Sequence, residues 1–231
     1  MAARFSGTTV VVTGASSGIG RALARAFAGE QAAVVGFARR FQAPRLAGPP
    51  AAGEIAEVRL DVTDEAAVRA RFAEVGAPDV LVACAGSFLT APFLETDVAM
   101  LRASLEVHIT GTFLCAREAL AAMALRRQGY IVVMGSIAAH RTFPGSVAYT
   151  AAKEGLRGLS RVLAEEARPL GVRVSALYAG AIDTPGWDDK PSFDRARMMR
   201  PERFAELVLE ICARPELAVE EVQILPPSGT L

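Results

Sequence analysis

Three side chains in the middle of the chain have the chemistry of an acid–base site. Tyr149 and Lys153 lie four residues apart in a helix-like stretch, which places the phenol and the ammonium on one helix face. A phenol with a pKa of about 10 is a poor acid–base group at neutral pH unless a nearby cation such as Lys153 stabilises the phenolate. Ser136 ends an apolar run before Tyr149, where its hydroxyl can hold a carbonyl oxygen that Tyr149 protonates. Taken singly, a Tyr-x-x-x-Lys pair can arise by chance and a serine there is usually a turn residue.

The apolar and periodic segments predict the elements that hold these residues. Short apolar runs alternate with longer helical stretches, as expected of stacked βαβ units. The sequence therefore predicts an α/β fold, a three-layer doubly wound (Rossmann-like) parallel sheet of about seven strands in a single domain over residues 1–231. The expected strands are 8–13, 32–37, 57–60, 80–83, 130–134, 172–178 and 222–225, and the expected helices are 19–28, 65–74, 97–127, 149–167 and 201–213.

Two segments break this pattern. Residues 40–53 contain three prolines and two glycines, so we expect a loop there instead of a crossover helix. Residues 185–200 mix proline, glycine, charges and two aromatic side chains before the last helix. A loop of this length in a compact domain is often a lid, so we expect a substrate lid, with a merely exposed connection as the alternative.

A glycine-rich turn follows the first expected strand and opens the first expected helix. In Thr13-Gly14-Ala15-Ser16-Ser17-Gly18-Ile19-Gly20, Gly14 permits a tight turn, Gly18 lets the backbone approach a pyrophosphate, and Gly20 lets helix and strand pack closely. Free N–H groups at a helix start favour an anion. No Gly-Lys-Ser/Thr follows, which excludes a P-loop, and the spacing is not G-x-G-x-x-G. On this motif alone, a dinucleotide site and a plain turn both remain open.

The end of the second strand bears on which nucleotide would bind. It reads Gly36-Phe37-Ala38-Arg39-Arg40, without the acidic residue that would bond a ribose 2′-hydroxyl. The Arg39 guanidinium offers a fork suited to a phosphate. This favours NADP(H) over NAD(H), and a solvated arginine pair is the alternative.

Composition excludes several classes of function. Lys plus Arg equals Asp plus Glu, so no net charge favours nucleic acid or an anionic membrane. No apolar stretch approaches the ~20 residues that span a bilayer, and the start leaves no room for a signal peptide. The three cysteines lack disulfide or metal spacing. We therefore expect a cytoplasmic protein with no metal, no nucleic acid and no membrane among its partners.

Five motifs in conjunction resemble the short-chain dehydrogenase/reductase family, in order over nearly the whole chain. They are the phosphate turn, Cys84-Ala85-Gly86, Ser136, the Tyr149/Lys153 pair and Ala179-Gly180-Ala181-Ile182-Asp183-Thr184. The resemblance implies an oxidoreductase that transfers a hydride between NADP(H) and a carbonyl or alcohol substrate. An NADP(H)-binding sensor or scaffold of the same fold with little turnover is the alternative, and a nucleic-acid binder is disfavoured.

The resemblance also implies roles for individual residues. Tyr149 would be the general acid–base, Lys153 would bind the nicotinamide ribose and lower the tyrosine pKa, and Ser136 would orient the substrate oxygen. Asp61 would border the adenine, although a strand-end turn acid is an equal alternative. The implied cofactor contacts are Gly14, Ser16, Ser17, Gly18, Ile19, Gly20, Arg39, Asp61, Val62, Ala85, Gly86, Tyr149, Lys153, Gly180, Ile182 and Thr184.

Three positions depart from the family pattern. His108 stands where the family usually has the asparagine that holds a water behind the lysine. An imidazole with a pKa near neutrality could relay protons as a working substitute, and a structural histidine is the alternative. Cys84 replaces another asparagine, and we expect it to be a packing residue. Ala179 replaces a proline, which loosens one turn.

The segment after Ser136 and the expected lid supply the walls of the substrate pocket. They are mostly apolar, which suggests a ketone or aldehyde of modest polarity. Arg141, Lys190 or Arg197 could bind a carboxylate or phosphate, but solvated surface is the favoured reading. The family forms dimers through helices that match 97–127 and 149–167, so we expect a homodimer or homotetramer. The expected pocket residues are Ile137, Phe143, Trp187 and Phe193.

Overall fold

Seven parallel strands form one sheet, in the order β3-β2-β1-β4-β5-β6-β7, in the computed structural model, which describes residues 3–190 and 192–230. Each strand is a short apolar segment, as expected for a parallel sheet covered on both faces. The predicted fold class is confirmed. The strands are β1 (Thr9–Thr13), β2 (Ala33–Ala38), β3 (Ile55–Arg59), β4 (Val80–Ala83), β5 (Gly129–Met134), β6 (Val172–Ala179) and β7 (Glu221–Ile224).

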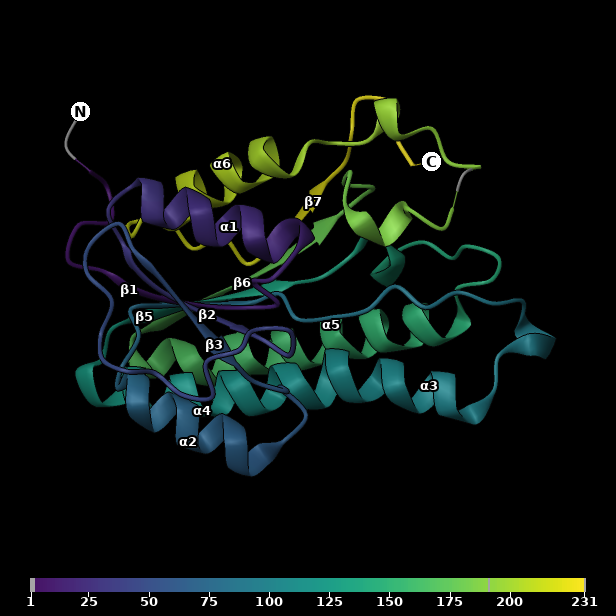
Figure 1. The fold of residues 1–231 in the computed structure, drawn as a ribbon. Helices are drawn as coiled ribbons and strands as arrows, with labels where there is room; N and C mark the ends of the chain where they lie inside the picture. Colours follow the sequence, from purple (N-terminus) through teal and green to yellow (C-terminus); the bar gives the residue numbers. More distant parts are fainter. Residues whose placement is uncertain (1–2, 191, 231) are drawn as a thin grey trace.

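Helices cover both faces of the sheet (Figure 1). Helices α1 (Gly18–Gly29) and α6 (Pro201–Cys212) pack together on one face. The other face is covered by α2 (Glu65–Val75), α4 (Gly111–Arg126) and α5 (Val147–Ala167), and α3 (Val98–Leu105) packs along α5.

The sheet separates two hydrophobic cores. Because successive side chains of a strand point to opposite faces, Val10 and Val12 of β1 pack in the core beneath α1 and α6, whereas Val11 packs in the core beneath α2, α4 and α5. In β5, Val132 and Val133 divide in the same way. All five side chains are fully buried, so β1 and β5 form a rigid base for the loops that follow them.

The strand order reverses beside β1. The chain runs outward from β1 to β3, then returns to place β4 on the other side of β1. In open α/β sheets, the crevice beyond the carboxyl ends of the strands at such a point is where ligands bind. The loops after β1 and β4 are therefore the loops expected to form a site.

Two expectations about individual elements can be compared with the structure. The structure describes no helix between β2 and β3, so the loop predicted over 40–53 is confirmed. The helix predicted over 97–127 is observed as one continuous helical run from Val98 to Arg126, in which a π turn at Glu106–Thr110 lies between α3 and α4. A π turn adds one residue to a helical turn and is frequent at functional sites. Here the inserted turn contains His108.

Candidate active site

One cavity of about 1050 Å³ lies at the carboxyl ends of the strands. Residues that follow β1, β4, β5 and β6 line it, from the glycine-rich turn to the segment after Ala179. Every residue that the sequence assigned to catalysis, cofactor or substrate lines this cavity. The structure therefore brings all the predicted site residues together.

The glycine-rich turn is held tightly against the end of β4. Gly14 has a φ of +72°, and a Cβ there would lie 2.9 Å from the carbonyl oxygen of Cys84. The Thr13 hydroxyl accepts hydrogen bonds from the N–H groups of Cys84 and Ala85, both at 3.0 Å. The Ser17 side chain does not cap α1. The start of α1 therefore keeps N–H groups available for an anion in the cavity.

Two arginines stand beside this turn. Arg39 and Arg40 both line the cavity, and the Arg40 guanidinium donates to Ser17 Oγ at 2.7 Å. The sequence predicted Arg39 as the residue that binds a phosphate of the cofactor. The structure adds Arg40, whose side chain also lines the cavity. Asp61 also lines the cavity, but its carboxylate accepts from the backbone N–H and hydroxyl of Thr63 at 3.0 and 2.9 Å. This geometry is that of a strand-end turn acid.

Ser136, Tyr149 and Lys153 meet where β5 ends and α5 begins. Ser136 lies two residues after β5, and its Oγ accepts from the N–H of Ala138 at 3.1 Å. Tyr149 lies in the first turn of α5. Lys153 is buried one turn later, with Nζ 5.6 Å from the Tyr149 ring centroid and donating to the Met134 carbonyl at 2.9 Å. The serine hydroxyl, phenol and ammonium thus share one wall of the cavity.

Burial governs the protonation of this wall. Burial raises the pKa of Tyr149 above its ordinary value, and a hydrogen bond with the Ser136 hydroxyl opposes that rise. Burial also lowers the pKa of Lys153 to about 8. The lowering of the Tyr149 pKa by Lys153 that the family resemblance implies stays a prediction, since desolvation is the dominant influence on the phenol in this structure. At neutral pH the phenol is protonated and the ammonium remains mostly charged.

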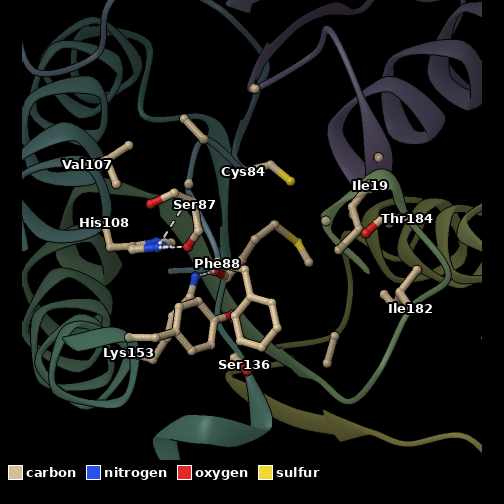
Figure 2. Close-up of a pocket in the computed structure, with 18 of the residues that line it drawn as sticks. Ile19, Cys84, Ser87, Phe88, Val107, His108, Ser136, Lys153, Ile182 and Thr184 are labelled. Atoms are coloured by element: carbon tan, nitrogen blue, oxygen red, sulfur yellow. Dashed lines mark hydrogen bonds between the residues drawn. The ribbon is translucent and has the colours of Figure 1, made fainter. Parts of the chain in front are cut away.

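His108 is a buried, neutral histidine. It is 2% exposed, and its Nε2–H donates to the Ser87 carbonyl at 2.8 Å (Figure 2). Its Nδ1 is buried without a hydrogen-bond partner among the described residues, and its ring lies 5.4 Å from the Tyr149 ring. Burial and, secondarily, the charge of Lys153 lower the pKa of His108 to about 3. The expected pKa near neutrality is wrong, because the ring is desolvated.

Aromatic side chains adjoin the catalytic wall. The Phe88 ring lies 4.9 Å from the Tyr149 ring and 5.1 Å from the Trp187 ring, and Trp187 lies 5.0 Å from Phe193. Phe88 was not predicted. The one signal for it is its place two residues after Gly86 of the Cys84-Ala85-Gly86 motif. The substrate end of the cavity is therefore aromatic.

Comparison with known proteins gives a consistent result. The family model for short chain dehydrogenases matches residues 8–194. The chain belongs to the short-chain dehydrogenase/reductase family. This short-chain dehydrogenase is 39% identical to cis-4-hydroxycyclohexanecarboxylate dehydrogenase of Sinomonas cyclohexanicum, over 97% of this chain and 91% of the relative. It is 34% identical to 2,5-dichloro-2,5-cyclohexadiene-1,4-diol dehydrogenase of Sphingobium indicum, over 78% and 75% of the two chains.

A solved structure agrees with these relatives. A short-chain dehydrogenase/reductase family protein superposes with a TM-score of 0.85 and 28% identity, over 97% of this chain and 98% of the other. The protein is therefore an NAD(P)-dependent oxidoreductase that acts on alcohol or carbonyl groups of small molecules.

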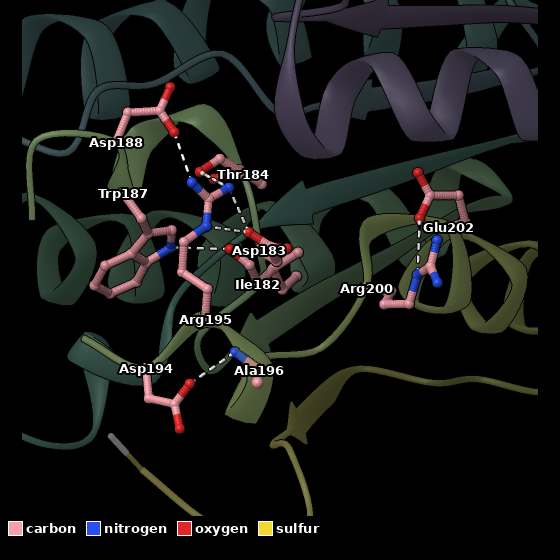
Figure 3. Close-up of polar contacts among 10 residues, drawn as sticks. All are labelled: Ile182, Asp183, Thr184, Trp187, Asp188, Asp194, Arg195, Ala196, Arg200 and Glu202. Atoms are coloured by element: carbon pink, nitrogen blue, oxygen red, sulfur yellow. Dashed lines mark hydrogen bonds and ion pairs between the residues drawn. The ribbon is translucent and has the colours of Figure 1, made fainter. Parts of the chain in front are cut away.

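The loop between β6 and α6 closes one side of this dehydrogenase's cavity. The Arg195 guanidinium pairs with Asp183 and with Asp188, the latter at 2.7 Å, and the indole N–H of Trp187 donates to the Ile182 carbonyl at 2.9 Å (Figure 3). These contacts hold Trp187 beside the end of β6. Its role as a moving lid stays a prediction.

Other side chains of the short-chain dehydrogenase offer little reactivity. Burial raises the pKa of the Cys84, Cys115 and Cys212 thiols to about 12, which agrees with packing residues. Within residues 3–190 and 192–230, no group of three His, Cys, Asp or Glu side chains could hold a metal ion. In the same part of the chain, no helix is long and apolar enough to cross a membrane.

Proposed function

We propose that this chain is an NADP(H)-dependent carbonyl reductase or alcohol dehydrogenase in which Tyr149 is the general acid–base. The observation that supports it most is the shared cavity. Ser136, Tyr149 and Lys153 line the same 1050 Å³ space as the glycine-rich turn at the start of α1. A dinucleotide cofactor would bind in this cavity with its phosphates at the glycine-rich turn and its reactive end at the proton donor.

The cavity fits the cofactor. Gly14 and the uncapped start of α1 would hold the pyrophosphate, because the N–H groups there face an anion without a side chain in the way. Arg39 and Arg40 would hold the 2′-phosphate that distinguishes NADP(H) from NAD(H). Ile182 and Thr184 would contact the nicotinamide amide. When bound, the cofactor supplies or accepts the hydride.

The chain's own residues would move the proton. Ser136 Oγ would hold the substrate oxygen in place. The Tyr149 hydroxyl would donate its proton to that oxygen when a carbonyl is reduced, and would accept a proton when an alcohol is oxidised. Its raised pKa keeps the phenol protonated at neutral pH, which suits reduction. The Lys153 ammonium would stabilise the phenolate left behind.

His108 would take part as a neutral group. Its Nε2–H is bound to Ser87, and its buried Nδ1 can accept a hydrogen bond behind Tyr149 and Lys153. We propose that His108 replaces the asparagine usual in the family in the proton path. Replacing His108 with Leu, which cannot hydrogen-bond, tests this, because an unchanged rate and pH–rate profile in that variant would count against a relay, whereas His108→Asn should keep the activity.

The substrate class follows from the walls. Phe88, Trp187 and Phe193 form an aromatic surface that begins at the Tyr149 ring, and Ile137 and Phe143 also line the cavity. Flat apolar walls favour a hydrocarbon ring. Two relatives are named for alcohols on six-membered rings, cis-4-hydroxycyclohexanecarboxylate and 2,5-dichloro-2,5-cyclohexadiene-1,4-diol. We therefore propose a cyclic secondary alcohol and its ketone as the reactants.

The experiment is NADPH oxidation with a panel of cyclic ketones, together with thermal protection by NADPH and by NADH. The proposal predicts ketone-dependent oxidation that the Tyr149→Phe variant loses, and stronger protection by NADPH. If NADPH protects but no ketone accelerates its oxidation and Tyr149→Phe changes nothing, the sensor or scaffold alternative is correct. Equal protection by the two cofactors would refute the role of Arg39.

A further inference from the structure

Lys190 lies at the aromatic end of the cavity. Its side chain is only 14% exposed, it lines the cavity, and its Nζ lies 5.1 Å from the Phe88 ring centroid. A hydrogen bond from its backbone N–H to the Trp187 carbonyl, at 3.0 Å, fixes the turn that carries it. Arg141 and Arg197 are not among the residues that line the cavity. The sequence suggested three cations that could bind an anionic group of the substrate. Among them, Lys190 is the one that lines the cavity.

The charges around this end of the cavity favour an anion. The chain contains two lysines, Lys153 and Lys190, and both line the cavity. Among the described lining residues, the one carboxylate is Asp61, at the end of β3 near the arginine pair. Asp189 pairs with Lys190 at 2.8 Å, but its side chain is 77% exposed. Water screens the charge of so exposed a carboxylate, so a ligand anion can share the ammonium.

Phe88 contacts both the Lys190 ammonium and the catalytic phenol. The Lys190 Nζ lies 5.1 Å from the Phe88 ring centroid, and the Tyr149 ring centroid lies 4.9 Å from it. A six-membered ring that lies against Phe88 and carries substituents on opposite carbons can therefore reach both groups. One substituent would lie at the Tyr149 hydroxyl, the ring against Phe88, and the other substituent at the ammonium.

We propose that Lys190 binds a carboxylate of the substrate, so that the preferred reactants are cyclic ketones and alcohols that carry a carboxylate across the ring from the reacting carbon. This inference rests on the proposed function, because it assumes the same reaction and the same catalytic residues. Lys190 is then a specificity-determining residue. It lies on the loop that is expected to act as the lid, so the same contact would hold that loop against the substrate.

The test compares two ketones and four proteins. The ketones are 4-oxocyclohexanecarboxylate and its methyl ester, which differ in charge at the distal group. The variants are Lys190→Met, which keeps the apolar stem, Lys190→Arg, which keeps the charge, and Arg141→Met as a matched control, because Arg141 is an exposed cation that does not line the cavity. The readouts are kcat and KM for each ketone, and calorimetric binding of cyclohexanecarboxylate to the NADPH-loaded proteins.

We expect Lys190→Met to lower kcat/KM for the carboxylate by about tenfold or more, mainly through KM, since the variant loses a charge-assisted hydrogen bond to the substrate. The methyl ester should change less than about twofold, because its distal group carries no charge. Lys190→Arg should retain most of the preference, and Arg141→Met should resemble the unmodified protein. Binding of cyclohexanecarboxylate should weaken by a similar factor in Lys190→Met alone.

Two other results separate this inference from the proposed function. If both ketones are reduced and Lys190→Met affects them equally, the carboxylate contact is wrong while the reductase assignment stands. If neither these two ketones nor the wider panel of cyclic ketones is reduced, the proposed function fails, and calorimetry still decides the inference. Binding of cyclohexanecarboxylate that depends on Lys190 supports the anion site, and binding that is absent or independent of Lys190 overturns it.

Discussion

Acidification should destabilise the fold through His108. The imidazole is 2% exposed, and burial lowers its pKa from 6.5 to about 3. Between these two values the unfolded chain binds a proton at this histidine and the folded protein does not. Protons therefore favour unfolding in this window. The stability is complete above the unfolded pKa of 6.5 and falls as the pH drops from there towards 3.

The size of the effect follows from the same two values. At pH 5 the solution lies about 1.5 units below the pKa of the unfolded histidine, and each unit corresponds to about 1.4 kcal/mol. His108 alone should thus lower the free energy of unfolding by about 2 kcal/mol between neutral pH and pH 5. Arginine partners lower the pKa of Glu30, Glu65 and Glu221. These carboxylates therefore also stabilise the folded protein, and that stabilisation is lost only at a lower pH, where they become protonated.

Urea unfolding at pH 7.5 and at pH 5 measures this contribution in the unmodified protein and in His108→Asn. The variant should lose about 2 kcal/mol less than the unmodified protein on acidification, whatever its stability at neutral pH. His140→Asn, which removes the chain's other histidine, should retain most of the acid dependence. Equal acid dependence in the unmodified protein and His108→Asn would refute the reasoning, because His108 would then bind protons equally in both states.

Two further substitutions test the cavity. Arg39→Ala should weaken NADPH binding about tenfold and leave NADH binding unchanged, since it removes one charge-assisted contact to the 2′-phosphate. Calorimetric titration with each cofactor measures this, and Arg45→Ala, at an exposed arginine, is the control. An equal loss of affinity for both cofactors would contradict the prediction. Gly86→Ala should cost about 1–3 kcal/mol in urea unfolding, because the new Cβ would lie 2.4 Å from His108 Cε1. Gly158→Ala on α5, where nothing lies within 4 Å, should be neutral or stabilising, and similar losses in the two variants would refute the packing argument.

The sequence was sufficient for the fold and for most of the side chains that the site argument uses, with Phe88 and Arg40 as exceptions. Apolar runs of strand length between helical stretches specify a parallel sheet, and such a sheet places all its strand ends at one edge. That single rule brings the turn after β1, Ser136 after β5 and the start of α5 together, although they are far apart in the chain. Strand limits differed by one or two residues, as in β3, where Ile55–Arg59 is observed and 57–60 was expected.

Properties that depend on several elements at once could not be predicted. The pKa of His108 depends on burial against Ser87 and Tyr149, and on the charge of Lys153, which come from separate parts of the fold. The π turn that contains it leaves no trace in a 3.6-residue periodicity. The aromatic contact of Phe88 with Trp187 joins loops after β4 and β6, and no spacing rule links them.

Hydride transfer in the Tyr149→Phe variant tests the central claim most directly. With NADPH and a cyclic ketone, removal of the hydroxyl should lower kcat by at least about a hundredfold, in line with losses of general acid catalysis. Thermal protection by NADPH should persist, because the phosphate turn and the arginine pair are unchanged. Tyr178→Phe, which removes a hydroxyl bonded to Glu221 away from the cavity, should keep full turnover. Undiminished ketone reduction in Tyr149→Phe with NADPH bound would contradict the account.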